Sequence, residues 1–391
     1  RWAMDTRPLR RPAYRRLWSS TIVTAVGSQL TAVAVPKQIY DITGSSAWVG
    51  YASLAGLLPL VVFALWGGAV ADSVDRRTLL LVTNTGIALT SVLFWVQAVT
   101  GLESVWTLMV LLALQQAFFG LNSPARNASV ARLVPADELA AAAALGSTVM
   151  QLGLVAGPLL AGALIPVIGL AELYLIDALA LCVTLWAVHR LPSLPPPDNT
   201  TRRAGWREVL AGFRYIALHK VLLLSFLADI IAMVLGMPRA LFPQLADTTY
   251  APYDEGLALG LLSGTFSRSH RHGLMVIAAV MAWGAAITGF GLSSSLWFAV
   301  LFLAAAGVAD MVSMIFRGAI LLSAATDEMR GRMQGVFTVV VAGGPRLADV
   351  LHGTAGAAFG ARAAVVGGGL LVMAAMLLLA TVTPALRRYR I

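Results

Sequence analysis

The chain has 391 residues, of which 58% are hydrophobic and only 12% are charged, and its mean hydropathy is +0.79. Soluble domains are about one quarter charged, so this composition excludes an ordinary water-soluble enzyme and predicts a polytopic helical membrane protein. The net charge is +9, and the single cysteine, Cys182, excludes a disulfide framework or a thiolate metal cluster within the chain.

A helix that crosses the membrane needs roughly 20 apolar residues. Between Glu255 and Arg268 the apolar run is too short to span, which indicates an eighth helix of which a part is absent from this chain. We therefore expect an all-α membrane protein with 12 transmembrane helices in two six-helix bundles, and 11 true spans are the alternative. In chain order, the other spans are predicted near residues 17–39, 48–71, 78–100, 105–123, 140–165, 168–188, 221–246, 274–292, 295–322, 333–360 and 363–384.

The longest polar stretch covers residues 189–220 and divides the chain into two halves that share features. The segment GGAVADSVDRRTLLL pairs with SGTFSRSHRHGLMVI, and LVPADELAAAAALGS pairs with SAATDEMRGRMQGVF. Such recurrence predicts an internal duplication. We expect an N-terminal bundle at residues 1–188, a cytoplasmic linker at 189–220 and a C-terminal bundle at 221–391.

Lysine and arginine are concentrated on one side of the predicted topology, which carries 23 of the 28. The other side holds mostly acids, such as Asp41, Glu103 and Glu172. The positive-inside rule then predicts a multi-pass protein of the inner cell membrane with both termini in the cytoplasm. The positive charges are spread over every cytoplasmic loop and are not collected into one patch, so we expect no nucleic-acid partner. The expected partner of the apolar spans is the lipid bilayer.

A short turn after the second predicted span reads GAVADSVDRR. It resembles the G-x-x-x-D-x-x-x-R-R loop signature of the major facilitator superfamily, and departs from it at Ser73, where a basic residue is usual, and at Asp75, where glycine is usual. Together with the topology and the degenerate second copy, the resemblance covers essentially the whole chain and implies the major facilitator fold. The resemblance also implies that this turn acts as a conformational switch. Its motif residues are Gly68, Asp72, Asp75, Arg76 and Arg77.

The fifth predicted helix contains GLVAGPLLAG, in which Gly153, Gly157 and Gly162 line one side and Pro158 bends the helix. This segment resembles the G-x-x-x-G-P-x-x-G motif of antiporters in the superfamily, which implies export rather than uptake. Plain helix packing is the alternative, because small residues four apart are common in membrane helices.

Three further segments resemble the enterobactin-exporter-like branch of the superfamily, which also contains macrolide and multidrug exporters. They are AFFGLNSPARNASVARLVPADEL (117–139), GMPRALFPQLA (236–246) and ADMVSMIFRGAILLSAATDEMRGR (309–332). The resemblance implies a monomer that exports a small amphipathic molecule, a siderophore of the enterobactin type or a drug, by rocking of two bundles. The energy source would be protons moving down their gradient, with no cofactor.

Two alternatives to siderophore export stay open: a multidrug or macrolide pump, and a lipid-translocating or sensing protein without proton coupling. A membrane enzyme is not expected, because the sequence contains no G-x-x-x-x-G-K-[ST], G-x-S-x-G or H-E-x-x-H run. No metal site is expected either, since His270 and His272 flank Arg271 and no carboxylate or thiol completes a site.

An ionisable side chain near the bilayer centre costs at least about 2.5 kcal/mol, so charges inside spans are functional candidates. The expected proton-coupling residues are Asp229, the first choice because of its depth, and Asp310, Asp177 and Asp349. Structural ion pairing is the alternative, for example between Asp349 and Arg346, which lie three residues apart.

Cationic and amide side chains within spans are the expected substrate contacts. A cation would favour an anionic or catecholate substrate, although Lys37 could instead reach the outer interface or pair with Asp41. Hydrogen bonding between helices is the alternative role for each glutamine. The set comprises Lys37, Gln29, Gln116, Arg239 and Arg317.

Overall fold

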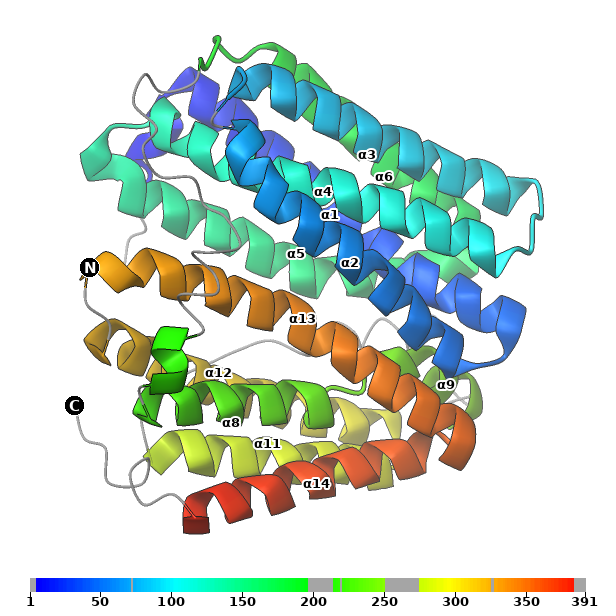
Figure 1. Ribbon diagram of the computed structural model, residues 1–391. Coiled ribbons are helices and arrows are strands. Elements are labelled where there is room, and N and C mark those ends of the chain that lie inside the picture. The colour runs from blue at the N-terminus through cyan, green and yellow to red at the C-terminus, as the bar shows by residue number, and fades with distance from the viewer. Residues whose placement is uncertain are drawn as a thin grey trace. The chain divides into compact units, whose positions relative to one another are not determined.

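The computed structural model describes residues 5–71, 73–195, 214–218, 220–249, 274–324 and 327–382. Every regular element within these ranges is helical (Figure 1). Seven spans among them are long and apolar enough to cross a membrane. The prediction of an all-α membrane protein is confirmed, whereas the predicted shortened eighth helix, between residues 255 and 268, lies outside the described residues.

The chain forms two compact units. The first comprises Arg1–Gln38 and Ala55–Gly205, and the second comprises Ile39–Leu54 and Trp206–Ile391. The segment 39–54 therefore packs with residues far along the chain rather than with its sequence neighbours. The three-part division with boundaries at residues 188 and 220 stays a prediction, because residues 196–213 lie outside the described part.

The first unit is built mainly from six helices, of which α3 packs against both α4 and α6 (Figure 1). Side-chain caps set two of the helix starts: Asp75 accepts from the Thr78 amide, and Ser104 accepts from the Thr107 amide. The elements in order are η1 (Arg7–Arg10), α1 (Pro12–Thr43), α2 (Ser46–Ala71), α3 (Arg76–Val99), α4 (Val105–Leu133), η2 (Ala136–Glu138), α5 (Leu139–Ile168) and α6 (Leu170–His189).

In the second unit, α11 packs against α12 and α14, and α13 packs against α8 and α14 (Figure 1). The span predicted over 221–246 agrees with an apolar span at Phe226–Thr248, but its helix is interrupted: it stops at Gly236 and restarts after a 3₁₀ turn. Pro238 has no amide hydrogen and disfavours helical geometry in the residue before it. The elements are α8 (Lys220–Gly236), η3 (Arg239–Leu241), α9 (Phe242–Thr248), α11 (Leu274–Leu292), α12 (Leu296–Ala324), α13 (Asp327–Phe359) and α14 (Ala361–Val382).

Two glycines occupy corresponding turns in the two halves of the chain. Gly169 joins α5 to α6 with φ +85°, and Gly360 joins α13 to α14 with φ +84°. Only glycine adopts such backbone angles readily, so each pair of helices is connected through one residue. This correspondence agrees with the internal duplication expected from the sequence.

Large apolar side chains lie on the surfaces of both units. Val167 is 77% exposed, and Phe359 is 78% exposed. A water-soluble monomer rarely exposes extensive apolar patches, whereas helices that face lipid do so throughout.

Candidate functional site

Asp177 on α6 is the centre of a buried polar network in the first unit. Its side chain is almost fully enclosed, and its Oδ2 accepts hydrogen bonds from Thr31 Oγ1 at 2.8 Å and Ser91 Oγ at 2.9 Å. Gln115 Nε2 donates to Ser91 Oγ at 3.1 Å. The network around this carboxyl group thus joins four helices, α1, α3, α4 and α6, with α4 attached through Ser91.

The space around the Asp177 carboxyl is shaped by Gly27 on α1, where a Cβ atom would lie 2.9 Å from Asp177 Oδ1. No lysine or arginine forms an ion pair with Asp177 within the described residues. Hydroxyl groups can donate to a carboxylate and can accept from a carboxylic acid. The network can therefore hold this side chain with or without a proton.

A second polar network in the same unit joins Gln38 on α1 to Gln97 on α3 and Tyr174 on α6. The two glutamines exchange hydrogen bonds at 3.1 and 2.9 Å, and Tyr174 Oη donates to Gln38 Oε1 at 2.8 Å. Phe94 stacks on Tyr174 with ring centroids 5.2 Å apart. The sequence analysis did not predict this network. A signal was present, because Gln38 lies seven residues after Thr31, the partner of Asp177, so both side chains share one face of α1.

Arg126 is a further residue that the sequence analysis did not single out, because it was counted among the cytoplasmic arginines. It lies within α4, seven residues before the helix ends at Leu133, and is only partly exposed. Its Nη1 donates to Thr21 Oγ1 on α1 at 2.8 Å. A cation that reaches an adjacent helix inside a span is a candidate contact for an anionic substrate.

The turn between α2 and α3 forms hydrogen bonds with the segment that follows α6. Asp75 Oδ2 accepts from Ser193 Oγ at 2.5 Å and from the Leu194 amide at 2.8 Å. Arg77 Nη2 donates to the His189 carbonyl at 2.6 Å. Of the other expected motif residues, Gly68 lies in α2, Arg76 is buried with its amide bonded to the Leu194 carbonyl, and Asp72 lies outside the described residues.

The Asp75→Ala variant is expected to unfold more easily than the wild type at neutral pH. Burial raises the pKa of Asp75, but hydrogen bonds from Ser193 and from the amides of Thr78 and Leu194 together bring the pKa below its usual value. A lowered pKa stabilises the fold above the ordinary carboxyl pKa, and the gain is lost as the pH falls through the lowered value. Loss of the cap should cost about 1–2 kcal/mol.

Thermal unfolding in detergent between acidic and neutral pH measures this effect. The difference between wild type and Asp75→Ala should shrink below about pH 4. Glu103→Ala, which removes an exposed acid from the loop before α4, is the matched control and should unfold like the wild type. A pH-independent difference would contradict the role given to the Asp75 charge.

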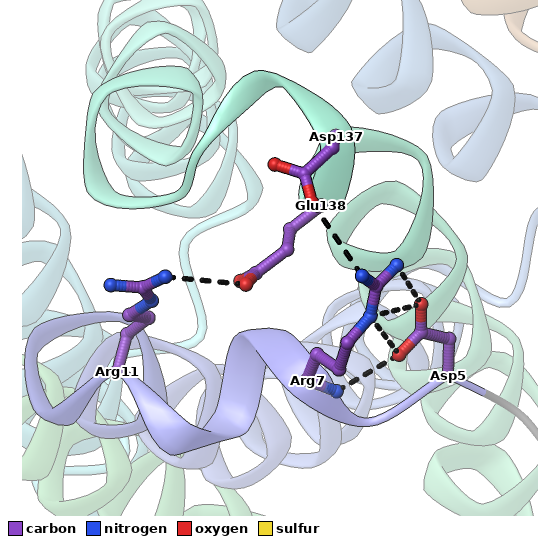
Figure 2. A network of polar contacts seen from close by, with 5 residues as sticks. All are labelled: Asp5, Arg7, Arg11, Asp137 and Glu138. Carbon is purple, nitrogen blue, oxygen red and sulfur yellow. Dashed lines mark hydrogen bonds and ion pairs between the residues drawn. The ribbon is translucent and has the colours of Figure 1, made fainter.

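The segment before α1 is attached to the start of α5 by charged pairs (Figure 2). Arg7 pairs with Asp5 at 2.7 Å and with Asp137 at 3.5 Å, and Arg11 pairs with Glu138 at 3.3 Å. Hydrogen bonds from Arg7 hold the pKa of Asp5 below its usual range. Since exposed pairs contribute little energy singly, we interpret this network as orienting η1 rather than as a binding site.

The glycines of the antiporter-like motif bring α5 against α1. A Cβ atom at Gly153 would lie 3.0 Å from Ala25 Cβ, and one at Gly157 would overlap Gln29 Cβ. Gly162 is buried, and Pro158 lies inside the helix. The close approach fixes the position of Gln29, one of the expected substrate contacts.

An apolar cavity of about 520 Å³ lies between α1 and α5 in the first unit. Its polar side chains are those of Thr6, Thr148 and the Trp18 indole, whose Nε1 already donates to the Leu145 carbonyl. The other lining residues are Leu9, Ile22, Val26, Leu145, Val149, Leu152, Gly153 and Ala156. Such a lining suits an apolar part of a ligand.

In the second unit, Asp349 on α13 forms an ion pair with Arg239 on η3, with Nη2 and Oδ2 3.6 Å apart. Ser53 Oγ donates to the same oxygen at 2.7 Å, and Arg346 Nη1 donates to the Ser53 carbonyl at 3.5 Å. One expected substrate contact, Arg239, is therefore engaged with one expected proton-coupling residue.

The remaining expected residues are distributed over both units. Lys37 is buried in α1, and Gln116 is partly buried in α4. Asp229 is buried in α8, and Asp310 is partly buried in α12. The side chain of Arg317, also in α12, lies outside the described part.

A family model described as "Transmembrane secretion effector", a group of major facilitator transporters, matches residues 3–388. This match covers nearly the whole chain. The chain belongs to the major facilitator superfamily. Its helices therefore form the major facilitator fold, as the loop motif and the repeated halves implied.

This major facilitator chain is also similar to known exporters. It is 30% identical over 394 residues to the enterobactin exporter EntS of Escherichia coli O1:K1 / APEC, with 97% of this chain and 94% of the relative covered. The same values hold for the enterobactin exporter EntS of Shigella boydii serotype 18. The chain is thus a transporter of a small molecule and not an enzyme, and a multi-pass membrane protein.

Among solved structures, a mutant form of the nucleoside transporter NupG has a TM-score of 0.74 with this chain at 12% sequence identity. The comparison covers 94% of this chain and 99% of that chain. At this identity the likeness concerns the fold alone.

Proposed function

We propose that this transporter exports a small amphipathic molecule of the enterobactin type from the cytoplasm in exchange for protons. Similarity to the enterobactin exporter over 97% of the chain supports the substrate class. The observation that carries proton coupling is the Asp177 carboxyl, buried and held only by hydroxyl groups within the described residues. The protein would act as a monomer in the inner membrane, with both termini in the cytoplasm.

The coupling step follows from the hydrogen bonds of Asp177. A proton on Oδ2 would make one donated hydrogen bond from Thr31 or Ser91 reverse or break, whereas a proton on Oδ1 would leave both bonds to Oδ2 in place. In either case, loss of the negative charge weakens the bonds that remain, since charge-assisted hydrogen bonds are the stronger ones. Protonation thus changes the attachment of α1 to α3 and α6, and alternating access would use this change.

A multidrug or macrolide exporter is the second candidate, and the cavity between α1 and α5 favours it. That cavity offers mainly aliphatic contacts and no charged side chain to a catecholate. An amphipathic drug would bury its apolar surface there without losing hydration of charged groups.

Proteoliposomes that contain a pH-sensitive dye test the proposal. Enterobactin, a macrolide and a cationic dye are added separately, with and without a protonophore. A pH change evoked by enterobactin supports siderophore–proton exchange, and one evoked only by the macrolide or the dye supports the second candidate. Binding of a compound without any pH change contradicts proton coupling and favours lipid translocation or sensing.

A further inference from the structure

One face of α1 changes from cationic to apolar beside the cavity between α1 and α5. The cavity residues of α1 are Trp18, Ile22 and Val26, which lie within the first ten residues of the span predicted from residue 17. Arg15 precedes them on the same face, because it lies seven residues before Ile22 and eleven before Val26. At about 1.5 Å per residue, Arg15 is ~10 Å from Ile22 along the helix axis. The change from charged to apolar side chains therefore falls at the edge of the span.

Arg15 is available to a ligand, whereas two neighbouring arginines are engaged. Its side chain is exposed and forms no ion pair with an acid within the described residues. Arg7 pairs with Asp137 at 3.5 Å (Figure 2). Arg11 pairs with Glu138 at 3.3 Å in the same network. These two pairs attach the segment before α1 to the start of α5, and the charge of Arg15 stays uncompensated.

The segments at this end of the cavity carry an excess of positive charge. Residues 5–19 and 135–145 contain five arginines and three acids, which leaves two positive charges in excess. A basic side chain at the membrane surface strengthens the binding of an anionic lipid by about fivefold. The charged residues are Asp5, Arg7, Arg10, Arg11, Arg15, Arg16, Asp137 and Glu138.

The interior of the cavity is suited to an acyl chain. Its volume of about 520 Å³ lies within the range of ligand pockets, roughly 300–1,000 Å³, and most of its lining is aliphatic. The Trp18 Nε1 donates to the Leu145 carbonyl at 3.2 Å, so the indole requires no polar group from an occupant. Leu152 lines the cavity and is 60% exposed, so the cavity opens on the surface of the first unit.

We infer that this cavity binds one acyl chain of an anionic phospholipid, whose phosphate lies at Arg15. Such a lipid has the same order of parts as this face of α1, with a charged group followed by an apolar chain. Trp18 stands at the boundary between them, where tryptophan is enriched in membrane proteins. Asp177 does not line the cavity, so the lipid site is separate from the proposed proton site and goes beyond the proposed export.

Native mass spectrometry of the purified protein in detergent tests the headgroup contact without any substrate. Phosphatidylglycerol and phosphatidylcholine with identical acyl chains are added separately, and the fraction of protein with one bound lipid gives the Kd of each. The wild type should prefer phosphatidylglycerol by about fivefold, and Arg15→Gln should remove this preference. Arg16→Gln changes the next exposed arginine, on another face of α1, and is the matched control that should keep the preference.

Ala156→Phe tests the position of the acyl chain. Ala156 lines the cavity, so a phenyl ring there should displace part of the chain. Displacement of two methylene groups weakens binding by roughly tenfold, and both lipids should be affected. Ala163→Phe, at an exposed alanine of α5 outside the cavity, is the control and should bind like the wild type. Phosphatidylglycerol with brominated chains should also quench the part of the fluorescence that Trp18→Phe removes.

Three results would overturn the inference. They are wild-type lipid binding by Ala156→Phe, equal loss of preference in Arg15→Gln and Arg16→Gln, and binding of a macrolide in the cavity where phosphatidylglycerol does not bind. If Ala156→Phe fails to fold, the Trp18 fluorescence decides, and absence of quenching by the brominated lipid overturns the inference. Failure of proton-coupled export would contradict the proposed function alone, because none of these measurements involves transport.

Discussion

Asp177→Asn is expected to abolish proton-driven export while leaving exchange of substrate across the membrane intact. Asparagine has the size of aspartate and can still bond to Thr31 and Ser91, but it cannot bind or release a proton. The substrate-evoked pH change in proteoliposomes should fall by at least about tenfold, which corresponds to ~1.4 kcal/mol or more. Exchange of labelled for unlabelled substrate requires no net proton transfer and should stay within about twofold of the wild-type rate.

Asp247→Asn is the matched control, because Asp247 is an exposed acid at the end of α9 in the other unit. It should transport like the wild type. Equal loss of exchange and proton-driven transport in Asp177→Asn would indicate a structural role for the network. Unchanged proton-driven transport would contradict the assignment and leave Asp229, Asp310 or Asp349 as the carrier.

Gly157→Leu is expected to prevent stable packing of α5 on α1 and to abolish transport. Even a Cβ atom at this position would overlap Gln29 Cβ, and leucine adds three further carbon atoms. Overpacking in a tight interior costs about 1–3 kcal/mol, and here the two helices must also separate. The unfolding temperature in detergent and the rate of substrate transport both measure the effect.

Gly146→Leu provides a control on the same helix. No atom lies within 4 Å of a Cβ built at Gly146, so the larger side chain meets open space. This variant should unfold at a temperature close to that of the wild type. If both variants were equally tolerated, the close approach of α5 to α1 would not be needed for folding or for transport.

The predicted spans agree well with the observed helices in segments that are long and apolar enough to cross the membrane. A backbone inside lipid must satisfy its own hydrogen bonds, so an apolar run of sufficient length becomes a helix whatever surrounds it. The window 274–292 coincides with α11, and the window 363–384 differs from α14 by two residues at each end. The break after Gly236 was missed, although Pro238 is visible in the sequence, because hydropathy windows ignore hydrogen-bond donors.

The candidate site was predictable only in part. Composition and apolar runs by themselves identify aspartates inside spans, because burial of a charge is costly wherever it occurs. Depth along the helix made Asp229 the first choice, whereas the three-dimensional structure directs attention to Asp177, whose hydroxyl partner Thr31 lies 146 residues away. The depth of a residue in the membrane can be estimated from its own helix, whereas its hydrogen-bond partners lie on several helices.

The sequence alone therefore determined the membrane-spanning helical class, the approximate spans and the family, because apolar length and the loop motif are local features. Tertiary structure decided which polar groups meet. Ser53 reaches Asp349 across 296 residues, and Trp18 donates to the Leu145 carbonyl across 127. Hydrogen bonds and desolvation depend on atoms within a few ångströms, and in this chain those atoms come from distant segments.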